Sequence, residues 1–175
     1  MKSLKFLFIF FILYIPLNYS YSQNQDIMMT EKADSIIQNL IVCSTPLSID
    51  DDMFFIQLID TISQKCLQDP HFFYALNCIS QTADGFVGEY LWEIMQFQFF
   101  HNYTLLSTYL FENFYETTNL QLFLVECLSI YIDDSNKKAK ARREIHQIII
   151  TKSSSIEIKK FMRNIEKRIT SNILA

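Results

Sequence analysis

The sequence predicts an all-α protein of about eight antiparallel helices, stacked as a short α–α superhelix. Apolar residues recur with the i, i+3, i+4, i+7 spacing of amphipathic helices along most of the 175 residues. Short breaks at turn residues interrupt this periodicity, and helices joined by short loops pack as antiparallel neighbours. No segment between turn signals alternates apolar and polar residues for long enough to predict a sheet.

Turn and capping residues set the boundaries of these helices. Pro46 separates the first two, because proline interrupts helical hydrogen bonding. Asp69 followed by Pro70 gives an N-cap and then a proline at the first helical position, which begins the third helix. The sixth helix is apolar nearly all round and therefore belongs in the middle of the domain. In chain order, helices are predicted over 30–42, from about 49 to 66, over 70–81, from the 83–85 turn to about 101, over 103–115, over 120–132, through 141–149 and from about 154 onward.

Residues 1–22 predict a secretory signal peptide. Lys2 and Lys5 form a short basic region, an apolar run follows as far as Leu17, and small residues precede the cleavage position after residue 22. A transmembrane helix needs about 20 consecutive apolar residues, so a retained membrane anchor is the alternative hypothesis. The ending Tyr-Ser-Gln resembles signal peptides of the Bacteroidota. We expect a protein exported to the periplasm or beyond, whose mature part, residues 23–175, forms a single all-helical domain.

Two segments 49 residues apart resemble each other and suggest an internal repeat. Residues 74–80 (YALNCIS) align with residues 123–129 (FLVECLS), and two further helices follow each segment. This spacing predicts three-helix repeats over about 70–118 and 119–172. A chance similarity between two buried helices is the alternative. The layout resembles HEAT and armadillo helical-repeat proteins, although their loop prolines and Asp/Arg landmarks are not matched; the resemblance implies helices stacked as a short solenoid.

Glycine is scarce enough to exclude several classes of site. The chain has only Gly85 and Gly88, whereas phosphate-binding loops, dinucleotide-binding turns and nucleophile elbows each need several glycines at fixed spacing. The three histidines follow no metal-binding spacing, so neither a metal nor a cofactor is expected. The four cysteines fall at or near apolar helical positions, which favours buried free thiols over a disulfide framework; they are Cys43, Cys66, Cys78 and Cys127.

Glu89 and Glu93 lie one helical turn apart and are the candidate catalytic residues. Paired carboxylates can divide acid and base work in polymer hydrolysis. Their face is opposite the apolar stripe of the helix, where solvent would give both groups a similar environment, whereas catalytic acids normally need burial. The sequence therefore favours a protein that is not an enzyme, with hydrolysis as the alternative.

Trp92, Gln96 and Phe99 form a second stripe on the same predicted helix, separate from its Leu and Ile stripe. An exposed aromatic stripe is typical of a binding surface. In a stacked solenoid, burial of the helix on two sides is the favoured explanation of this stripe. The three residues are still the candidate surface for binding another protein.

Charge is distributed unevenly along the chain. Residues 137–168 hold eleven Lys and Arg against three Glu, whereas residues 23–136 hold sixteen acidic residues against two lysines. A basic face could bind an acidic partner, a membrane or a polysaccharide, and a solvated helix face is the alternative. Nucleic acid is not expected, because aromatic residues that would stack on bases are missing there. The candidate basic face comprises Lys138, Arg142, Lys159, Arg163 and Lys167.

The function predicted from the sequence is that of an exported, non-enzymatic protein-binding or inhibitor-like module of the cell envelope. Contact with a membrane is expected only through the signal peptide before cleavage. The alternatives are an envelope-polymer hydrolase that uses Glu89 and Glu93, and association of the basic face with a membrane or polysaccharide.

Overall fold

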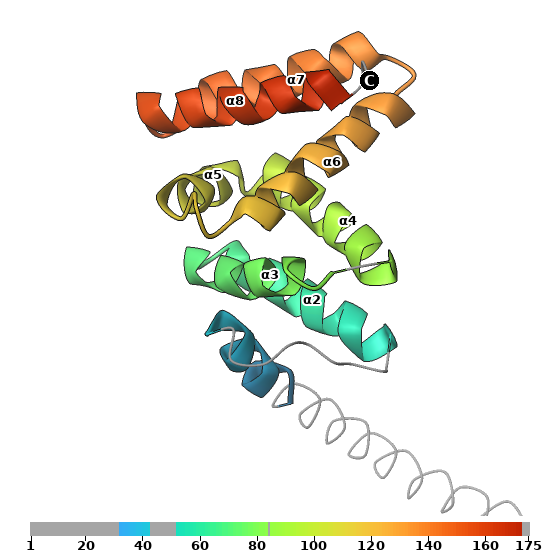
Figure 1. The fold of residues 1–175 in the computed structure, drawn as a ribbon, viewed down its shortest axis with the longest axis vertical. Coiled ribbons are helices and arrows are strands. Elements are labelled where there is room, and N and C mark those ends of the chain that lie inside the picture. Colours follow the sequence, from blue (N-terminus) through green and yellow to red (C-terminus); the bar gives the residue numbers. More distant parts are fainter. Residues whose placement is uncertain (1–31, 43–51, 84, 173–175) are drawn as a thin grey trace, which may run out of the picture. The chain divides into compact units, whose positions relative to one another are not determined.

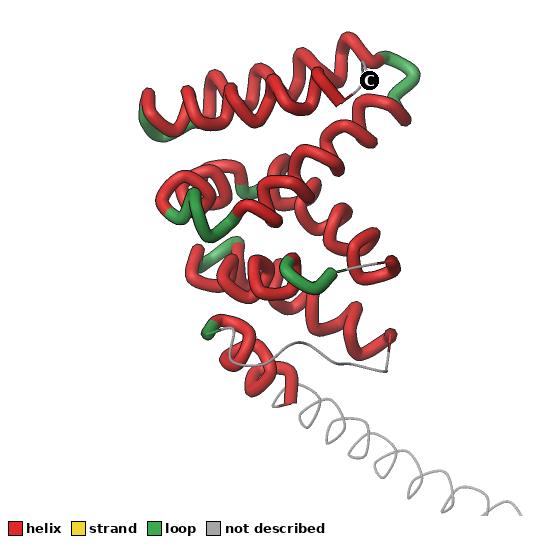
Figure 2. The backbone as a smooth tube through the Cα atoms, viewed as in Figure 1, coloured by secondary structure: helices red, strands yellow, loops and turns green. Residues whose placement is uncertain are grey.

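The computed structural model describes residues 32–42, 52–83 and 85–172 (Figure 1). Eight α-helices and one short 3₁₀ helix are found among these residues, with no strand (Figure 2). The prediction of an all-α fold with about eight helices is confirmed. The predicted signal peptide and Cys43 lie outside the described residues. The chain divides into two compact units, residues 1–36 and residues 37–175.

The helices from α2 onward all belong to the second unit. Residues 32–41 form the helix that precedes them. The others are α2 (Asp52–Cys66), the 3₁₀ helix η1 (Pro70–Phe72), α3 (Phe73–Ser80), α4 (Gly85–His101), α5 (Tyr103–Glu112), α6 (Thr118–Asp134), α7 (Lys138–Lys152) and α8 (Ile156–Asn172).

Two boundaries show how local chemistry sets the helices. The predicted cap is present, since the Asp69 carboxylate accepts a hydrogen bond from the His71 N–H at 2.8 Å immediately before the Pro70 turn. The prediction that the fifth helix extends to Tyr115 is wrong, because α5 ends at Glu112. Asn113 closes that helix as its C-cap, and the chain then leaves the helix axis.

Helices of even number contact one another along the second unit. α4 packs between α2 and α6, and α6 packs in turn against α8, while α7 and α8 lie side by side (Figure 1). α6 also contacts α3, which gives it the central position that its apolar sequence predicts. Cys78 of α3 and Cys127 of α6 are both buried. The three-helix repeat stays a prediction.

Two buried side chains, Gln98 near the end of α4 and Asn102 at the N-cap of α5, satisfy backbone carbonyls in the last turn of α2. The last four carbonyls of a helix have no partner within it. Gln98 Nε2 donates to the Ser63 carbonyl at 2.9 Å and to Ser63 Oγ at 2.8 Å. Asn102 Nδ2 donates to the Cys66 carbonyl at 2.7 Å and to Gln98 Oε1 at 2.8 Å. Burial of these polar groups is therefore compensated, and they fix how α4 sits against α2.

Cys66 and Cys127 are free thiols within the core. Burial is the main reason that the pKa of each thiol is raised, and the nearby Asp69 carboxylate adds to the effect at Cys66. Since the thiolate is the reactive form, both side chains are doubly protected, by lack of access and by protonation.

We therefore expect N-ethylmaleimide to leave Cys66 and Cys127 unmodified in the native protein at mildly alkaline pH. The same treatment in concentrated guanidinium should modify both, because unfolding exposes the thiols and restores their ordinary pKa. Peptide mass spectrometry distinguishes the two positions. Equal rates of labelling in the folded and unfolded protein would contradict the buried placement.

Candidate functional site

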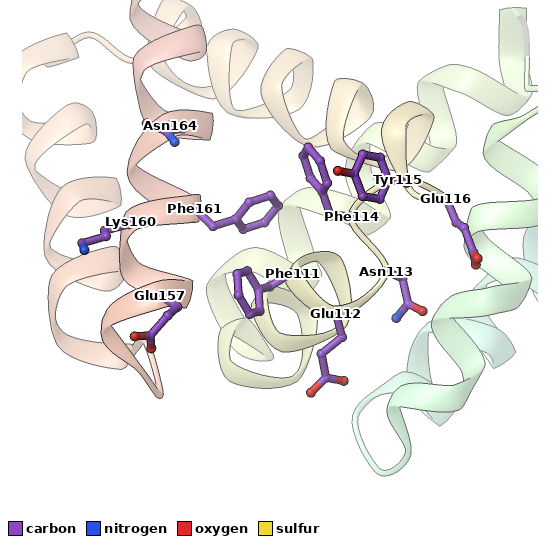
Figure 3. A pocket seen from close by; sticks show the side chains of 10 residues that line it. All are labelled: Phe111, Glu112, Asn113, Phe114, Tyr115, Glu116, Glu157, Lys160, Phe161 and Asn164. Carbon is purple, nitrogen blue, oxygen red and sulfur yellow. The ribbon is translucent and has the colours of Figure 1, made fainter.

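A groove with a volume of about 650 Å³ lies between the end of α5, the loop of residues 113–117 and the first half of α8 (Figure 3). This is within the range of small-molecule and peptide-binding cavities. We call it the aromatic groove, because four rings line it, those of Phe111, Phe114, Tyr115 and Phe161. Its polar lining residues are Glu112, Asn113, Glu116, Glu157, Lys160 and Asn164.

The four rings form one cluster across the groove. Phe161 of α8 meets Phe111 edge-on at 5.8 Å and Phe114 edge-on at 5.9 Å, and Phe114 meets Tyr115 at 4.7 Å between ring centroids. These are favourable aromatic geometries. The cluster is nevertheless open to solvent, since Phe111 is 38% exposed, Phe114 45% and Tyr115 89%. Several large exposed aromatic side chains in one place are characteristic of a binding surface.

The 113–117 loop that carries Phe114 and Tyr115 is held by its own backbone and polar side chains. The Asn113 carbonyl accepts hydrogen bonds from the N–H groups of Glu116 and Thr117, each at 3.0 Å. Thr117 Oγ1 donates to the same carbonyl at 2.9 Å. Asn113 Nδ2 donates back to the Tyr109 carbonyl at 3.0 Å, which ties the start of the loop to α5.

Side chains of two neighbouring helices hold the same loop from within the protein. Gln121 of α6 donates through Nε2 to the Phe114 carbonyl at 2.9 Å, and Asn77 of α3 donates through Nδ2 to the Glu116 carbonyl at 3.1 Å. Tyr74 of α3 donates its hydroxyl proton to Asn113 Oδ1 at 2.8 Å. Asn77 and Gln121 are both buried. Because these bonds come from the packed interior, they anchor the loop backbone from which Phe114 and Tyr115 project.

The rim of the aromatic groove is predominantly acidic. Glu112, Glu116 and Glu157 contribute carboxylates, and Lys160 contributes an ammonium group. Glu157 lies in the first turn of α8, where a backbone hydrogen bond and one from Ser155 lower the pKa of its carboxyl. With three carboxylates against one ammonium group, the residues of the rim carry a net negative charge at neutral pH.

Of the predicted partner-binding stripe, Phe99 is placed in the core. It is fully buried and packs edge-on against Phe100 at 5.3 Å and Tyr103 at 5.4 Å. The prediction that Phe99 faces a partner is therefore wrong. Trp92 and Gln96 are half-buried, and Trp92 Nε1 donates to Glu126 of α6 at 3.0 Å. The stripe is explained by α4 lying between α2 and α6, which buries it on two sides.

The candidate catalytic residues Glu89 and Glu93 are both exposed on α4. Neither is among the residues that line the aromatic groove. The sequence predicts this exposure, because both residues lie on the face of the helix opposite its apolar stripe.

The five predicted basic-face residues lie on α7 and α8, and acidic neighbours compensate some of them. Lys138 Nζ lies 2.7 Å from an Asp133 carboxylate oxygen. Arg163 Nε lies 3.2 Å from one Glu166 oxygen, and the other Glu166 oxygen lies 2.9 Å from His146 Nδ1. The remaining members of the face are Arg142, which is exposed, Lys159, which is half-buried, and Lys167, which is exposed.

The sequence indicates a loop at the aromatic groove, although the helical periodicity of the preceding residues favoured a continuous helix there. Residues 113–119 read NFYETTN, in which polar residues of the kind found in loops surround two aromatic side chains. Helical periodicity instead predicted a fifth helix that continues to Tyr115. Phe161 is half-buried and forms one wall of the groove.

The fold and the groove together describe an all-α protein of stacked helices with an exposed aromatic surface. No family model matches the chain, and no curated protein or solved structure matches it.

Among the helices of the described segments, none combines the length and the apolar character needed to cross a bilayer. Nor do the side chains described there bring three His, Cys, Asp or Glu residues together as a possible metal site.

Proposed function

We propose that the protein is an exported, non-enzymatic protein-binding module that recognises its partner through the aromatic groove. The observation that carries this proposal is the exposure of Phe114 and Tyr115 on a loop held by buried side chains of α3 and α6. A rigid aromatic surface buries a large apolar area while losing little conformational entropy on binding. Aromatic side chains of this kind dominate the binding energy of many protein interfaces.

Export is part of the same proposal. It is supported by the basic and apolar pattern of residues 1–22, which has the order of regions found in secretory signal peptides. The expected location is the periplasm or the extracellular space.

The two alternative functions receive less support. Hydrolysis by Glu89 and Glu93 would need carboxylates in contrasting environments, and both side chains are solvent-exposed on one helix. Association of the basic face with a membrane or polysaccharide is weakened because Lys138 and Arg163 already have acidic neighbours.

Photocrosslinking at position 115 identifies the partner. A benzoylphenylalanine placed at Tyr115 in the native host should form an adduct with one particular protein on irradiation. The same group placed at Phe86, an exposed aromatic position in the first turn of α4 and outside the groove, should not form that adduct.

Tyr115→Ala should weaken binding of the purified partner by about 10- to 100-fold, since truncating a central aromatic contact costs roughly 2 kcal/mol or more. The measurement is a titration by calorimetry or surface plasmon resonance. Phe86→Ala is the matched control and should bind as the wild type does. Wild-type affinity of Tyr115→Ala would exclude the groove as the recognition surface.

A further inference from the structure

A second hollow, with a volume of about 260 Å³, adjoins the aromatic groove. The two share Glu112 and Asn113 in their linings, so they lie next to each other on either side of these two residues at the end of α5. The other residues that line the second hollow come from the turn before η1 and from η1, α3 and α5; they are Asp69, Pro70, His71, Tyr74, Leu105, Thr108 and Tyr109.

The second hollow is as firmly built as the groove. Tyr74 lies edge-on to Tyr109 at 5.1 Å and to His71 at 5.4 Å between ring centroids. The Tyr74 hydroxyl is fixed on Asn113, the residue at which the second hollow meets the aromatic groove. A ligand that lies across both hollows would therefore meet a preformed surface, with little to reorganise on binding.

Charge along this surface has one predominant sign. The two linings together contain the carboxylates of Asp69, Glu112, Glu116 and Glu157, against the single ammonium group of Lys160. Glu112 belongs to both linings, so a cation beside it would be close to both hollows. Complementary charge at an interface selects the partner and speeds its association.

We infer that the partner presents a basic segment that lies across both hollows. An aromatic or aliphatic side chain of this segment occupies the aromatic groove, and Lys or Arg side chains pair with Glu112 and with Glu157 at the rim of the groove. A cation so placed gains from the carboxylate and from the neighbouring ring faces. This inference rests on the proposed function, because it specifies the chemistry of a protein ligand for the same site.

Selection of a phage-displayed random peptide library on the purified protein tests the inference. Peptides whose binding is lost in Tyr115→Ala should be enriched in Lys or Arg next to an apolar residue. Synthetic fluorescent copies should then bind Glu112→Gln or Glu157→Gln about 10-fold more weakly, since each change removes one partner of an interfacial charge pair. Glu89→Gln, a change of the same kind at an exposed site outside both hollows, should leave the affinity unchanged.

A substitution in the second hollow tests whether the segment reaches it. Thr108→Arg places bulk and positive charge in that hollow and should weaken the same peptides at least as much as Glu112→Gln does. Circular dichroism and denaturation midpoints equal to those of the wild type show that the fold is retained. Unchanged affinity in Thr108→Arg would overturn the placement of the segment across both hollows.

The inference and the proposed function fail in different ways. The basic segment is overturned if the Tyr115-dependent peptides are neutral or acidic. It is also overturned if they bind Glu112→Gln and Glu157→Gln as tightly as they bind the wild type. Either result leaves the proposed protein-binding function standing. A selection that yields no peptide dependent on Tyr115 overturns both.

Discussion

Phe99→Ala should lower the free energy of unfolding by about 3–5 kcal/mol, the loss typical of removing a buried phenyl ring from a packed core. Phe99 is fully buried and packs edge-on against Phe100 and Tyr103. α4 is enclosed by α2 and α6, so the neighbours cannot collapse into the space without moving a helix. Denaturation in urea followed by circular dichroism measures the change.

Phe86→Ala is the matched control on the same helix. Its ring is 45% exposed, although it lies near Phe55 at 6.4 Å and Tyr90 at 6.5 Å. We expect a loss below about 1 kcal/mol, as for most exposed positions. A loss in Phe99→Ala as small as that in Phe86→Ala would contradict the placement of Phe99 in the core.

Gln98→Leu should lower the free energy of unfolding by about 2–4 kcal/mol despite being nearly isosteric and more apolar. The substitution removes the donor that serves the Ser63 carbonyl and hydroxyl, and it removes the acceptor for Asn102 Nδ2. Each buried polar group left without a partner costs roughly 1–3 kcal/mol. Denaturation in urea measures this change as well.

Gln96→Leu makes the same chemical change two residues earlier, where the side chain is only half-buried. Its effect should stay within about 0.5 kcal/mol. A Gln98→Leu variant as stable as the Gln96→Leu variant would show that the contacts between α4 and the end of α2 do not depend on this hydrogen-bond network.

The fold was largely predictable because helical periodicity reports directly which residues are buried. The Asp69 cap was predicted from local sequence, and the central place of α6 was predicted from its apolar character all round. Both features depend on residues close together in the chain. The position of Phe99 was not predictable in this way, because it depends on α2 and α6 lying on opposite sides of α4.

The aromatic groove was missed for a similar reason. The fifth helix was predicted over 103–115 and so includes both Phe111 and Phe114, whereas α5 ends at Glu112. The loop after it is held by Asn77 of α3, 39 positions before the Glu116 carbonyl, and by Gln121 of α6, seven positions after Phe114. The wall formed by Phe161 is separated from Phe111 by 50 positions, and no local pattern links them.

The way the 113–117 loop is anchored affects how the binding specificity of this protein can evolve. Its anchoring groups face inward, while Tyr115 is 89% exposed and Phe114, which is 45% exposed, packs at the surface against Tyr115 and Phe161. New side chains at these two positions would alter what the surface recognises without disturbing the helices beneath. Specificity could therefore diverge by a few substitutions on a constant framework, and a library randomised at positions 114 and 115 would be a compact route to engineered binders.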